Sequence, residues 1–471
     1  MEAQKSENTS QPVRENEQAS PSLEQQVAQL KKLRLGDFKL LETVIPGTEN
    51  LNPDRGNKRT LWLNDPNEAR KADRKKLMNR LEIWRDLLSD DTTSTEQITS
   101  KADNLQKSLE ALLKTNLYEV TQETRELEST YRGVASFFIN AETSGLKVRN
   151  VHFVDAPLEQ LNPEHTDYEG ETLEYIKKSI HQVYNQFDLT DSYSLLVVPG
   201  YLGSKVAVDT WATIANNHKL MLITDFVDEQ SLEMIRDSFL TDEIASDEGK
   251  YANVLMTANY LVGRGKYTEL EEEEDLYVAP SAALAGKVYM NLISQSSMGL
   301  QYGALEQTNG VRLDLLKTEV GELENLGLIP MTKAFGKVIP FSARTLYNGS
   351  NVGLKTYSVV RVFDWIMKVL MHFLNKRAGE NWSSTVEQQI KKEIIRFLDS
   401  ITGPGRVIDR FDTPKFDKDP ADPSRIVLDI NITPFFPAKT FIINLHGEQG
   451  LNPNTARRNS FEGSIDQRRD S

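Results

Sequence analysis

Two segments near the C-terminus alternate apolar and polar residues, and this pattern constrains the fold more than any other in the chain. The apolar side chains recur at every second position of Arg425–Thr433 and of Thr440–Leu445; they are Ile426, Leu428, Ile430 and Ile432, then Phe441, Ile443 and Leu445. Such alternation predicts two β-strands, each with one apolar face. No partner strand is evident nearby, and a lone two-stranded ribbon is marginal in water and exposes unpaired edges. We therefore expect these edges to be covered by the rest of the chain or by another chain.

Composition indicates an ordinary soluble protein. The chain has 471 residues, 39% of them hydrophobic and 26% charged, with a net charge of −14 and no cysteine. The negative charge argues against nucleic-acid binding, and the absence of cysteine excludes disulfides and thiolate metal sites. The N-terminus lacks the apolar run of a signal peptide, and no segment approaches the roughly 20 apolar residues that a membrane span needs. We predict a cytoplasmic protein with no membrane insertion.

The first 140 residues divide into a polar tail and a helical region. Residues 1–21 are rich in Glu, Gln, Ser and Asn, a composition that predicts disorder. In the helical region, residues 22–140, Ser22 begins a short helix over residues 22–36, whose apolar stripe is Leu23, Val27 and Leu30. This helix either docks on its own domain or is presented to a partner protein as a helix that fits a groove. A second helical stretch runs from about Ser94 to Glu128.

Residues 141–400 have the pattern of an α/β core. Ser194–Val198 and Leu220–Ile223 are short apolar runs on either side of a helical pattern, which predicts a β-α-β unit with parallel strands. Further strands are expected at Val151–Val154, Val254–Met256 and Leu328–Met331. The fold class is therefore α/β, a central mixed sheet with flanking helices. The strongest helical pattern is Tyr357–Leu374, with an apolar stripe of Val360, Phe363, Met367, Leu370 and Leu374, and another helix carries Val386, Ile390, Ile394 and Phe397.

The last residues divide into the strand region and a tail. Residues 401–446 hold the strand pair, preceded by a Pro- and Asp-rich stretch, Asp412–Pro423, that predicts a loop. Residues 447–471 are polar and mixed in charge, which predicts a disordered tail.

No residue pattern in the chain predicts catalysis or metal binding. The six histidines are scattered without metal-ligand spacing, so we expect neither a metal nor a cofactor. The turn at Gly200–Lys205 lies between a predicted strand and a helix, but two residues separate its glycines where a Walker A loop has four. An acidic run at Glu269 and Glu271–Asp275 is typical of a solvated loop and could also pair with a basic partner. An interaction protein is thus the leading class; the alternative is a cytoplasmic α/β enzyme that binds a phosphate-containing ligand at residues 200–205.

Three segments resemble one protein family. Leu127–Gly133 resembles the Leu-Glu-x-(Ser/Thr)-aromatic-Arg-Gly segment of the large subunit of the type VI secretion contractile sheath, TssC or VipB. Glu322–Pro330 is similar to that family's Glu-Leu-x-x-Leu-Gly-(Phe/Leu)-Ile-Pro segment, and Ser358–Leu370, with Arg361 in its first turn, to its Ser-Arg-Phe helix. The resemblance covers roughly residues 100–446. Tyr131 stands where the family usually has Trp, and residues 1–95 match poorly, which indicates a divergent branch such as the system found in Bacteroidetes.

The resemblance implies a structural, non-enzymatic role. Members of this family pair with a small sheath subunit (TssB or VipA), and further copies of the heterodimer stack around an inner tube on a baseplate. Strands of neighbouring small subunits add to the large subunit's C-terminal strands, here Ile426–Ile432 and Phe441–Ile443. Contraction drives the tube outward, and an AAA+ ATPase resembling ClpV dismantles the spent sheath through an N-terminal helix. In this chain that helix would be the one carrying Leu23, Val27 and Leu30.

Overall fold

The structure is a computed structural model in which the chain forms two compact units. It describes residues 94–142, 145, 147–148, 150–164, 171–422 and 424–438, with scattered residues between 71 and 85 and the backbone of 442–448 and 458–464. One unit comprises Met1–Glu123 with Thr268–Glu272, and the other comprises Thr124–Tyr267 with Glu273–Ser471. The predicted helix at residues 22–36 and the predicted tail at 1–21 lie outside the described residues.

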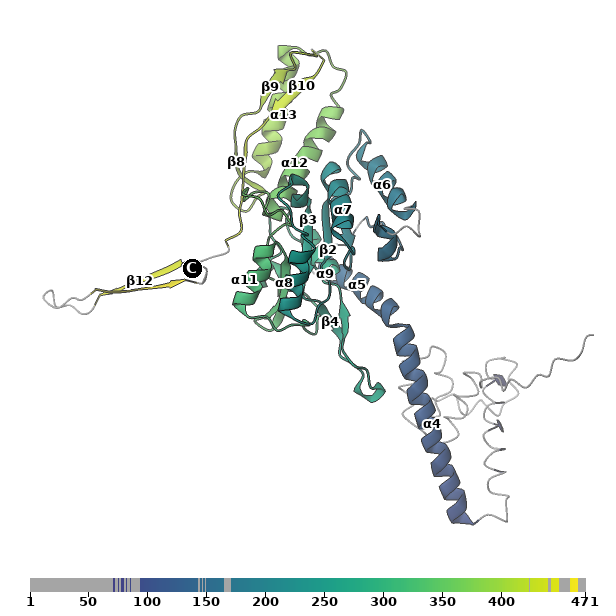
Figure 1. Cartoon of the computed structure of the whole chain (residues 1–471). Helices are drawn as coiled ribbons and strands as arrows, with labels where there is room; N and C mark the ends of the chain where they lie inside the picture. Colours follow the sequence, from purple (N-terminus) through teal and green to yellow (C-terminus); the bar gives the residue numbers. More distant parts are fainter. Residues whose placement is uncertain are drawn as a thin grey trace, which may run out of the picture. The chain divides into compact units, whose positions relative to one another are not determined.

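In the first unit the described part is dominated by the long helix α4 (Thr95–Glu123) (Figure 1). Ser94 and Gln97 form a reciprocal cap: the Ser94 Oγ accepts from the Gln97 N–H at 3.3 Å, and the Ser94 N–H donates to the Gln97 Oε1 at 3.2 Å. This cap satisfies backbone donors that a helix start leaves free, and it explains why the helix begins where the sequence predicts. The short helix η6 (Thr268–Leu270) belongs to this unit, where the Lys114 Nζ lies 2.5 Å from the Glu271 Oε1.

The second unit is built around a five-stranded sheet in the order β1-β2-β3-β6-β7. The strands are β1 (Leu195–Val198), β2 (Met221–Asp225), β3 (Val254–Ala258), β6 (Ile329–Ala334) and β7 (Lys337–Pro340). The first four are parallel, and β7 returns antiparallel to β6. Every residue of β2 and β3 is buried, as expected of parallel strands covered by helices on both faces.

Helices flank this sheet and connect its strands. They are α5 (Arg125–Ala141), α6 (Glu171–Tyr184), α7 (Lys205–Asn217), α8 (Leu232–Thr241), α9 (Ser281–Met290), α10 (Gly299–Gly303) and α11 (Lys317–Leu326), with the 3₁₀ turns η3 (Leu158–Leu161) and η5 (Gly249–Asn253). A small hairpin, β4 (Leu261–Arg264) with β5 (Leu276–Val278), lies beside α5. The α5 helix thus belongs to the second unit, although the sequence groups it with the N-terminal helices.

Small residues bring α9 and α5 close together. Gly286 faces the α5 backbone so closely that a Cβ at this position would lie 2.5 Å from the Phe137 carbonyl oxygen and 2.8 Å from the Asn140 Cβ. The neighbouring residues Ala282, Ala283 and Ala285 are buried as well. Glycine is required here by space, because no larger side chain fits without moving the α5 backbone.

Two long helices carry a second hydrophobic cluster at the C-terminal end of this unit. They are α12 (Tyr357–Asn375) and α13 (Ser384–Ile401), which lie side by side (Figure 1). Ser383 caps α13 through its Oγ, which accepts from the Val386 N–H at 3.3 Å. The buried members of the cluster are Val362, Ile366, Ile390, Ile394, Leu398, Val407 and Ile408.

Most core elements confirm the sequence-based predictions. The β-α-β unit is present with parallel strands, and the strands at 254–256 and 328–331 and both C-terminal helices form where the apolar patterns predict. The prediction of a strand at Val151–Val154 is wrong: this segment has no regular structure, and all three of its apolar residues are exposed.

Substitution of Gly286 by Ala tests the contact between α9 and α5. Alanine normally stabilises a helix relative to glycine by about 1 kcal/mol, but the steric conflict at this site opposes that gain. We expect a net loss of about 1–3 kcal/mol in the free energy of unfolding, measured by urea denaturation. Gly249→Ala is the control, because a Cβ at Gly249 meets no atom within 4 Å. Equal stability of the two variants would contradict the packing described.

Candidate assembly interface

The first predicted strand, Arg425–Thr433, forms half of a ribbon made entirely by this chain. It splits into β10 (Ile426–Asp429) and β11 (Ile432–Pro434), which pair antiparallel with β9 (Lys415–Lys418) and β8 (Ile408–Phe411) (Figure 1). The prediction that this strand has no nearby partner is therefore wrong, as is the prediction of a loop throughout 412–423. Between β10 and β11 the two sides of the ribbon remain hydrogen-bonded, because the Asp412 N–H donates to the Asn431 carbonyl at 2.9 Å.

One face of the ribbon packs on the helices α12 and α13. The predicted apolar residues Ile426, Leu428, Ile430 and Ile432 are all half-buried, and all but Ile426 join the second hydrophobic cluster. Val427, on the opposite face, is 42% exposed. The one-sided pattern of the sequence thus reflects packing within the chain, and these side chains are not a free docking surface.

The main chain of the same residues faces outward along the edge of the ribbon. The Asp419 N–H donates to the Arg425 carbonyl at 2.9 Å, which identifies Arg425 as hydrogen-bonded to the inner partner. Because bonded and non-bonded pairs alternate in antiparallel ladders, Val427 and Asp429 also bond inward. The backbone groups of Ile426, Leu428, Ile430 and Ile432 consequently point to the outer edge, where no third strand pairs within the described residues.

The opposite edge is partly covered by the chain itself. At the start of β8, Thr402 forms a bridge with Ile408, and the Gly403 N–H donates to the Ile408 carbonyl at 3.0 Å. Of the two edges, the one formed by β10 and β11 therefore offers the longer free row of donors and acceptors among the described residues.

The second predicted strand corresponds to β12 (Ile442–Glu448), which pairs antiparallel with β13 (Arg458–Ser464). Ile443 stands opposite Gly463 in this register, and Phe441 lies outside the described residues. The β13 strand falls within the 447–471 segment for which the sequence predicts a disordered tail, so the structure provides a second partner that the sequence does not indicate.

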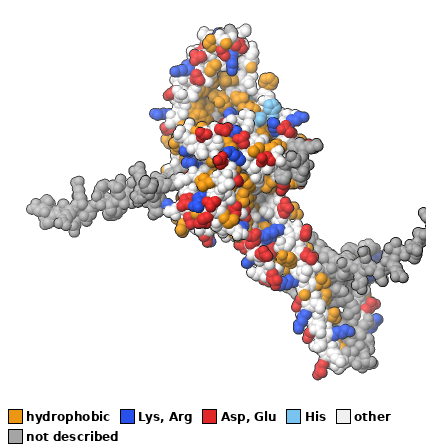
Figure 2. Space-filling model, viewed as in Figure 1, with side chains coloured by type: hydrophobic (Ala, Val, Ile, Leu, Met, Phe, Trp, Pro, Cys, Tyr) orange, Lys and Arg blue, Asp and Glu red, His pale blue; other side chains and the backbone are white. Residues whose placement is uncertain are grey.

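The apolar stripe of α12 is only partly covered. Val360 is buried, but Phe363 is 42% and Met367 50% exposed. Figure 2 shows hydrophobic side chains gathered in the part of the molecule where Figure 1 places α12, α13 and the ribbon. The sequence predicts this stripe without indicating that part of it faces outward.

The Gly200–Lys205 turn is held by the chain's own carboxylate rather than shaped for an anion. The Gly200 N–H donates to the Asp225 Oδ2 at 2.7 Å, and Ser204 caps α7 by accepting from the Ala207 N–H. The Lys205 Nζ lies 3.4 Å from the Glu243 Oε2. The Gly200 N–H and the Lys205 ammonium are thus already paired with carboxyl groups of the same chain, which opposes the alternative of a phosphate-binding enzyme.

Asp225 joins the carboxyl ends of three strands. Besides Gly200, the carboxylate accepts from the Ser281 N–H at 2.8 Å, the Ser281 Oγ at 2.5 Å and the Thr257 hydroxyl. Its side chain is completely buried, and burial raises its pKa while these donors oppose that rise. Its four hydrogen bonds make it a structural clamp.

The acidic run pairs with basic residues of its own chain. In the second unit the Arg312 Nη2 lies 3.1 Å from the Glu274 Oε2, and the Arg125 Nη2 donates to the Asp275 carbonyl at 2.6 Å. The Arg312 Nη1 also lies 2.8 Å from the Asp228 Oδ2, although burial still raises the pKa of Asp228 to about 6. Ion pairs and hydrogen bonds within the chain thus hold the acidic run, whereas its composition predicts a solvated loop.

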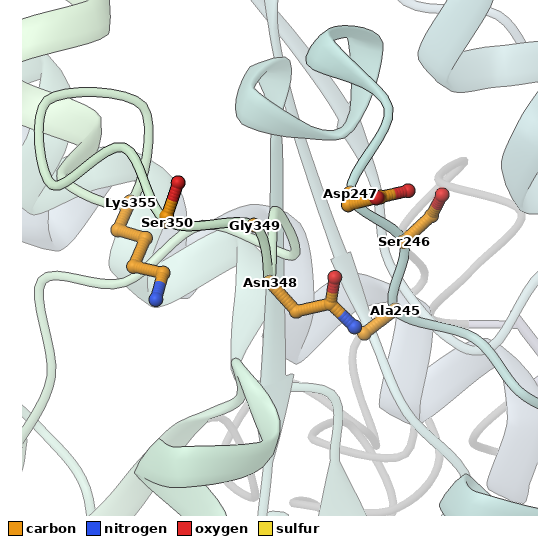
Figure 3. Close-up of a pocket in the computed structure, with 7 residues that line it drawn as sticks. All are labelled: Ala245, Ser246, Asp247, Asn348, Gly349, Ser350 and Lys355. Carbon is orange, nitrogen blue, oxygen red and sulfur yellow. The ribbon is translucent and has the colours of Figure 1, made fainter.

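A surface depression of the second unit has no catalytic arrangement. It encloses about 680 Å³ and is lined by Ala245, Ser246, Asp247, Asn348, Gly349, Ser350 and Lys355 (Figure 3). Its two loops are joined by the Asn348 N–H, which donates to the Ser246 carbonyl at 2.9 Å. In the described part of the chain no three His, Cys, Asp or Glu side chains are grouped to hold a metal ion, and no helix there could cross a membrane.

Comparison with protein families decides the identity. Three models match consecutive parts of the chain: the TssC/VipB-like N-terminal region at residues 23–117, the type VI secretion system TssC/VipB central domain at 119–348 and the TssC/VipB-like C-terminal domain at 356–462. The chain belongs to the TssC/VipB family. This TssC/VipB protein is therefore a structural subunit of a contractile sheath, as its sequence motifs predict, and the family match extends into the N-terminal region where the motifs match poorly.

Solved structures of contractile machines are also similar to this TssC/VipB chain. A chain of the anti-feeding prophage baseplate is 14% identical, with 68% of this chain and 80% of that chain covered and a TM-score of 0.48. A chain of the contracted sheath of the same prophage is 14% identical, with 60% of this chain and 78% of that chain covered and a TM-score of 0.44. A chain of the contracted sheath of the PVC extracellular contractile injection system is 15% identical, with 58% of this chain and 75% of that chain covered and a TM-score of 0.42. Comparison with curated proteins finds no match.

In the first TssC/VipB segment, Leu127–Gly133, one half of the residues makes contacts within the fold. Glu128 bridges two arginines: its Oε1 lies 2.8 Å from the Arg132 Nη2, and its Oε2 lies 3.0 Å from the Arg264 Nε. The other half faces outward, with Leu127 70% and Tyr131 71% exposed.

The second TssC/VipB segment, Glu322–Pro330, contains the end of α11 and the start of β6. Gly327 ends α11 in the left-handed conformation, with φ of 102°, and a Cβ there would lie 3.2 Å from the Thr345 carbonyl. Both the left-handed backbone and the limited space for a side chain therefore favour glycine at position 327.

Substitution of Asp225 by Ala tests the clamp. It leaves the Gly200 and Ser281 N–H groups and two hydroxyls buried without their acceptor, and each unsatisfied buried group costs about 1–3 kcal/mol. We expect a loss of at least about 3 kcal/mol in the free energy of unfolding, measured by urea denaturation. Asp237→Ala, which removes an exposed carboxylate paired only with its neighbour Arg236, should change stability by less than about 1 kcal/mol. A mild effect at Asp225 would show that the clamp is dispensable.

Proposed function

We propose that this TssC/VipB protein polymerises by strand addition at the outer edge of β10 and β11, together with a small sheath subunit of the TssB/VipA type. The observation that carries the proposal is the outward row of backbone groups at Ile426, Leu428, Ile430 and Ile432. A strand from another chain would pair with this row through main-chain hydrogen bonds. We propose that the partner-binding residues predicted from sequence in this strand act through their backbone.

Strand addition suits a sheath that must change shape without coming apart. Main-chain hydrogen bonds join two chains at a narrow line of contact, so the link can remain while the subunits change orientation through the chain segments that adjoin it. A contact of this head-to-tail kind does not close on itself, and repetition produces a helical filament. Successive copies of the heterodimer would be joined in this way around an inner tube and on a baseplate.

The exposed part of α12 provides a second contact in the same region. Phe363 and Met367 lie one turn apart and are about half exposed, although α12 is otherwise well covered. Two exposed apolar side chains on one face of the helix support a contact with the small subunit in addition to the strand edge. The strand β12, which includes Ile443, is proposed to take part in the same exchange beside Phe441.

The remaining roles concern residues and partners beyond the described part of the chain. We assign the helix at residues 22–36, with Leu23, Val27 and Leu30, to recognition by a ClpV-like AAA+ ATPase that dismantles the contracted sheath. The protein would act in the cytoplasm, without catalytic activity of its own. The carboxylate clamp at the Gly200–Lys205 turn supports this reading over the phosphate-binding alternative.

Proline at Leu428 tests strand addition. Proline removes an outward N–H that makes no bond within the ribbon, so the subunit should fold while losing a donor to the added strand. We expect Leu428→Pro, and likewise Ile430→Pro, to prevent polymers when co-expressed with the small subunit, as seen by negative-stain microscopy. Heterodimers should still form, as measured by size-exclusion chromatography.

Val427→Pro is the matched control for this experiment. Its N–H bonds inward to β9, so proline there should destabilise the ribbon itself and lower the melting temperature more than Leu428→Pro does. Normal tubules from Leu428→Pro would refute the assignment of this edge.

Deletion of residues 1–36 tests the role of the N-terminal helix. Since this segment precedes every described element, we expect sheaths to assemble and contract normally. ATPase-driven disassembly, followed by the decay of purified contracted sheaths with the ATPase and ATP, should be lost. Deletion of residues 1–21 alone, which retains the helix, should leave disassembly intact; unchanged disassembly by the longer deletion would contradict the proposal.

A further inference from the structure

An aromatic side chain stands at the tip of the β6–β7 hairpin, where neither its backbone conformation nor its exposure favours it. Phe335 and Gly336 form a two-residue turn, with φ of 53° and 75°. Such a turn favours Asn-Gly, because a bulky side chain is disfavoured in the left-handed conformation. Phe335 is also 82% exposed, the most of any large hydrophobic residue in the described part of the chain. The isolated fold therefore does not account for phenylalanine at this position.

Two lysines make the surface around this tip basic. Lys333 is exposed, and its side chain forms no ion pair or hydrogen bond with the residues that the structure describes. Lys337 lies on the other side of the turn, where its Nζ is 3.1 Å from the Glu306 Oε2. Both lysines line a hollow of about 180 Å³ beside the turn, together with Gly336 and residues of the loop 305–310. The tip thus presents an aromatic ring next to a basic hollow that is large enough for one side chain of a partner.

The outer face of α8 has the opposite charge and exposed apolar residues of its own. Residues 228–248 contain eight acidic residues and one basic residue. Within α8, Met234 and Leu240 are exposed, and each stands three positions from the exposed Asp237. Residues three apart on a helix are neighbours on its surface. Apolar and acidic side chains therefore lie side by side on this face, in the combination that complements the hairpin tip.

The carboxylates of the α8 face are available to a partner. The Glu233 side chain is exposed and makes no ion pair or hydrogen bond with any described residue. The Asp237 carboxylate pairs with its sequence neighbour Arg236 at 3.2 Å, a contact at the surface. Among the described residues, no hydrogen bond or ion pair joins α8 to the tip of the hairpin within one chain. Both surfaces thus remain open in the single chain.

We propose that the β6–β7 tip of one copy docks on the α8 face of a second copy of this chain in the assembled sheath. This inference rests on the proposed function. Phe335 packs against Leu240, and Lys333 pairs with the carboxylates of Glu233 and Asp237, which flank that contact. The two surfaces are different, so the contact is head-to-tail and propagates from copy to copy instead of closing on itself. It joins large subunits to one another directly, in addition to the added strand.

The contact is too small to hold two free chains together. Stable interfaces bury roughly 1,200 Å² or more, and a hairpin tip on one face of a short helix covers much less. The contact therefore forms only where strand addition already holds the copies next to each other. This dependence is consistent with a single chain in which both surfaces are exposed.

Phe335→Asn separates a role in assembly from a role in the fold. Asparagine is favoured at this turn position, so the melting temperature of the purified full chain should be unchanged or higher. In co-expression with the small subunit, the yield of sedimentable polymer should fall roughly tenfold or more, as expected for the loss of an aromatic anchor. Phe187→Asn is the control, because Phe187 is 80% exposed elsewhere on the surface and its loss should leave the yield unchanged.

Reversal of charge tests whether the partner is a second copy. Lys333→Glu should lower the polymer yield, and so should the double variant that combines Glu233→Lys with Asp237→Lys, because each places like charges opposite one another. The combination of all three substitutions should restore a substantial part of the yield, since attraction returns with the signs exchanged.

Several outcomes would overturn the inference. A lower melting temperature for Phe335→Asn would mean that the ring stabilises its own chain, and an unchanged polymer yield would mean that the tip takes no partner. Loss of polymer with Phe335→Asn, but not with the reversal on α8, would assign the tip to a different chain. If Leu428→Pro blocks assembly while Phe335→Asn does not, only this inference fails; if the wild-type pair does not polymerise, the proposed function fails with it.

Discussion

The need to pair backbone N–H and C=O groups shapes this chain more than any other requirement. In the central sheet, parallel pairing from β1 to β6 leaves the strands β2 and β3 completely buried, and helices cover both faces. The C-terminal ribbon meets the same requirement only in part: its two strands pair with each other and Thr402 covers the start of β8, but among the described residues no strand pairs with the outer edge of β10 and β11. A protein that exposes such an edge risks uncontrolled association, so a persistent free edge is more consistent with a partner than with solvent.

Sequence patterns predict the parts of this fold in which burial is continuous or strictly periodic. The run at Leu220–Ile223 is apolar because both sheet faces are covered at β2, and the run at Ser194–Val198 likewise predicts a strand, although most of β1 is only half-buried. The same reasoning fails at Val151–Val154, where a short apolar run lies exposed. It also misses β8 and β9, whose sequences, Ile-Asp-Arg-Phe and Lys-Phe-Asp-Lys, are too short and too charged to differ from a loop.

Contacts between distant charges lie beyond what a single sequence can indicate. Glu128 meets Arg264, and Arg312 meets Asp228, only because α5, the β4–β5 hairpin and the neighbouring loops fold against one another. The acidic run looks like a solvated loop for the same reason: its basic partners come from other parts of the sequence.

The ribbon is anchored on one side and free on the other, and this asymmetry bears on how a sheath could contract. Leu428, Ile430 and Ile432 hold the ribbon to the cluster formed by α12 and α13, so a strand added at its edge would move as one body with those helices. After β11 the chain continues through Pro434-Phe435-Phe436-Pro437, of which only Pro434 takes part in a ladder. Proline lacks the donor that a continuing strand needs, so the ribbon cannot extend rigidly into β12. Under strand addition, changes of orientation between subunits would therefore be absorbed in this connection, while the hydrogen-bonded links on either side of it stay intact.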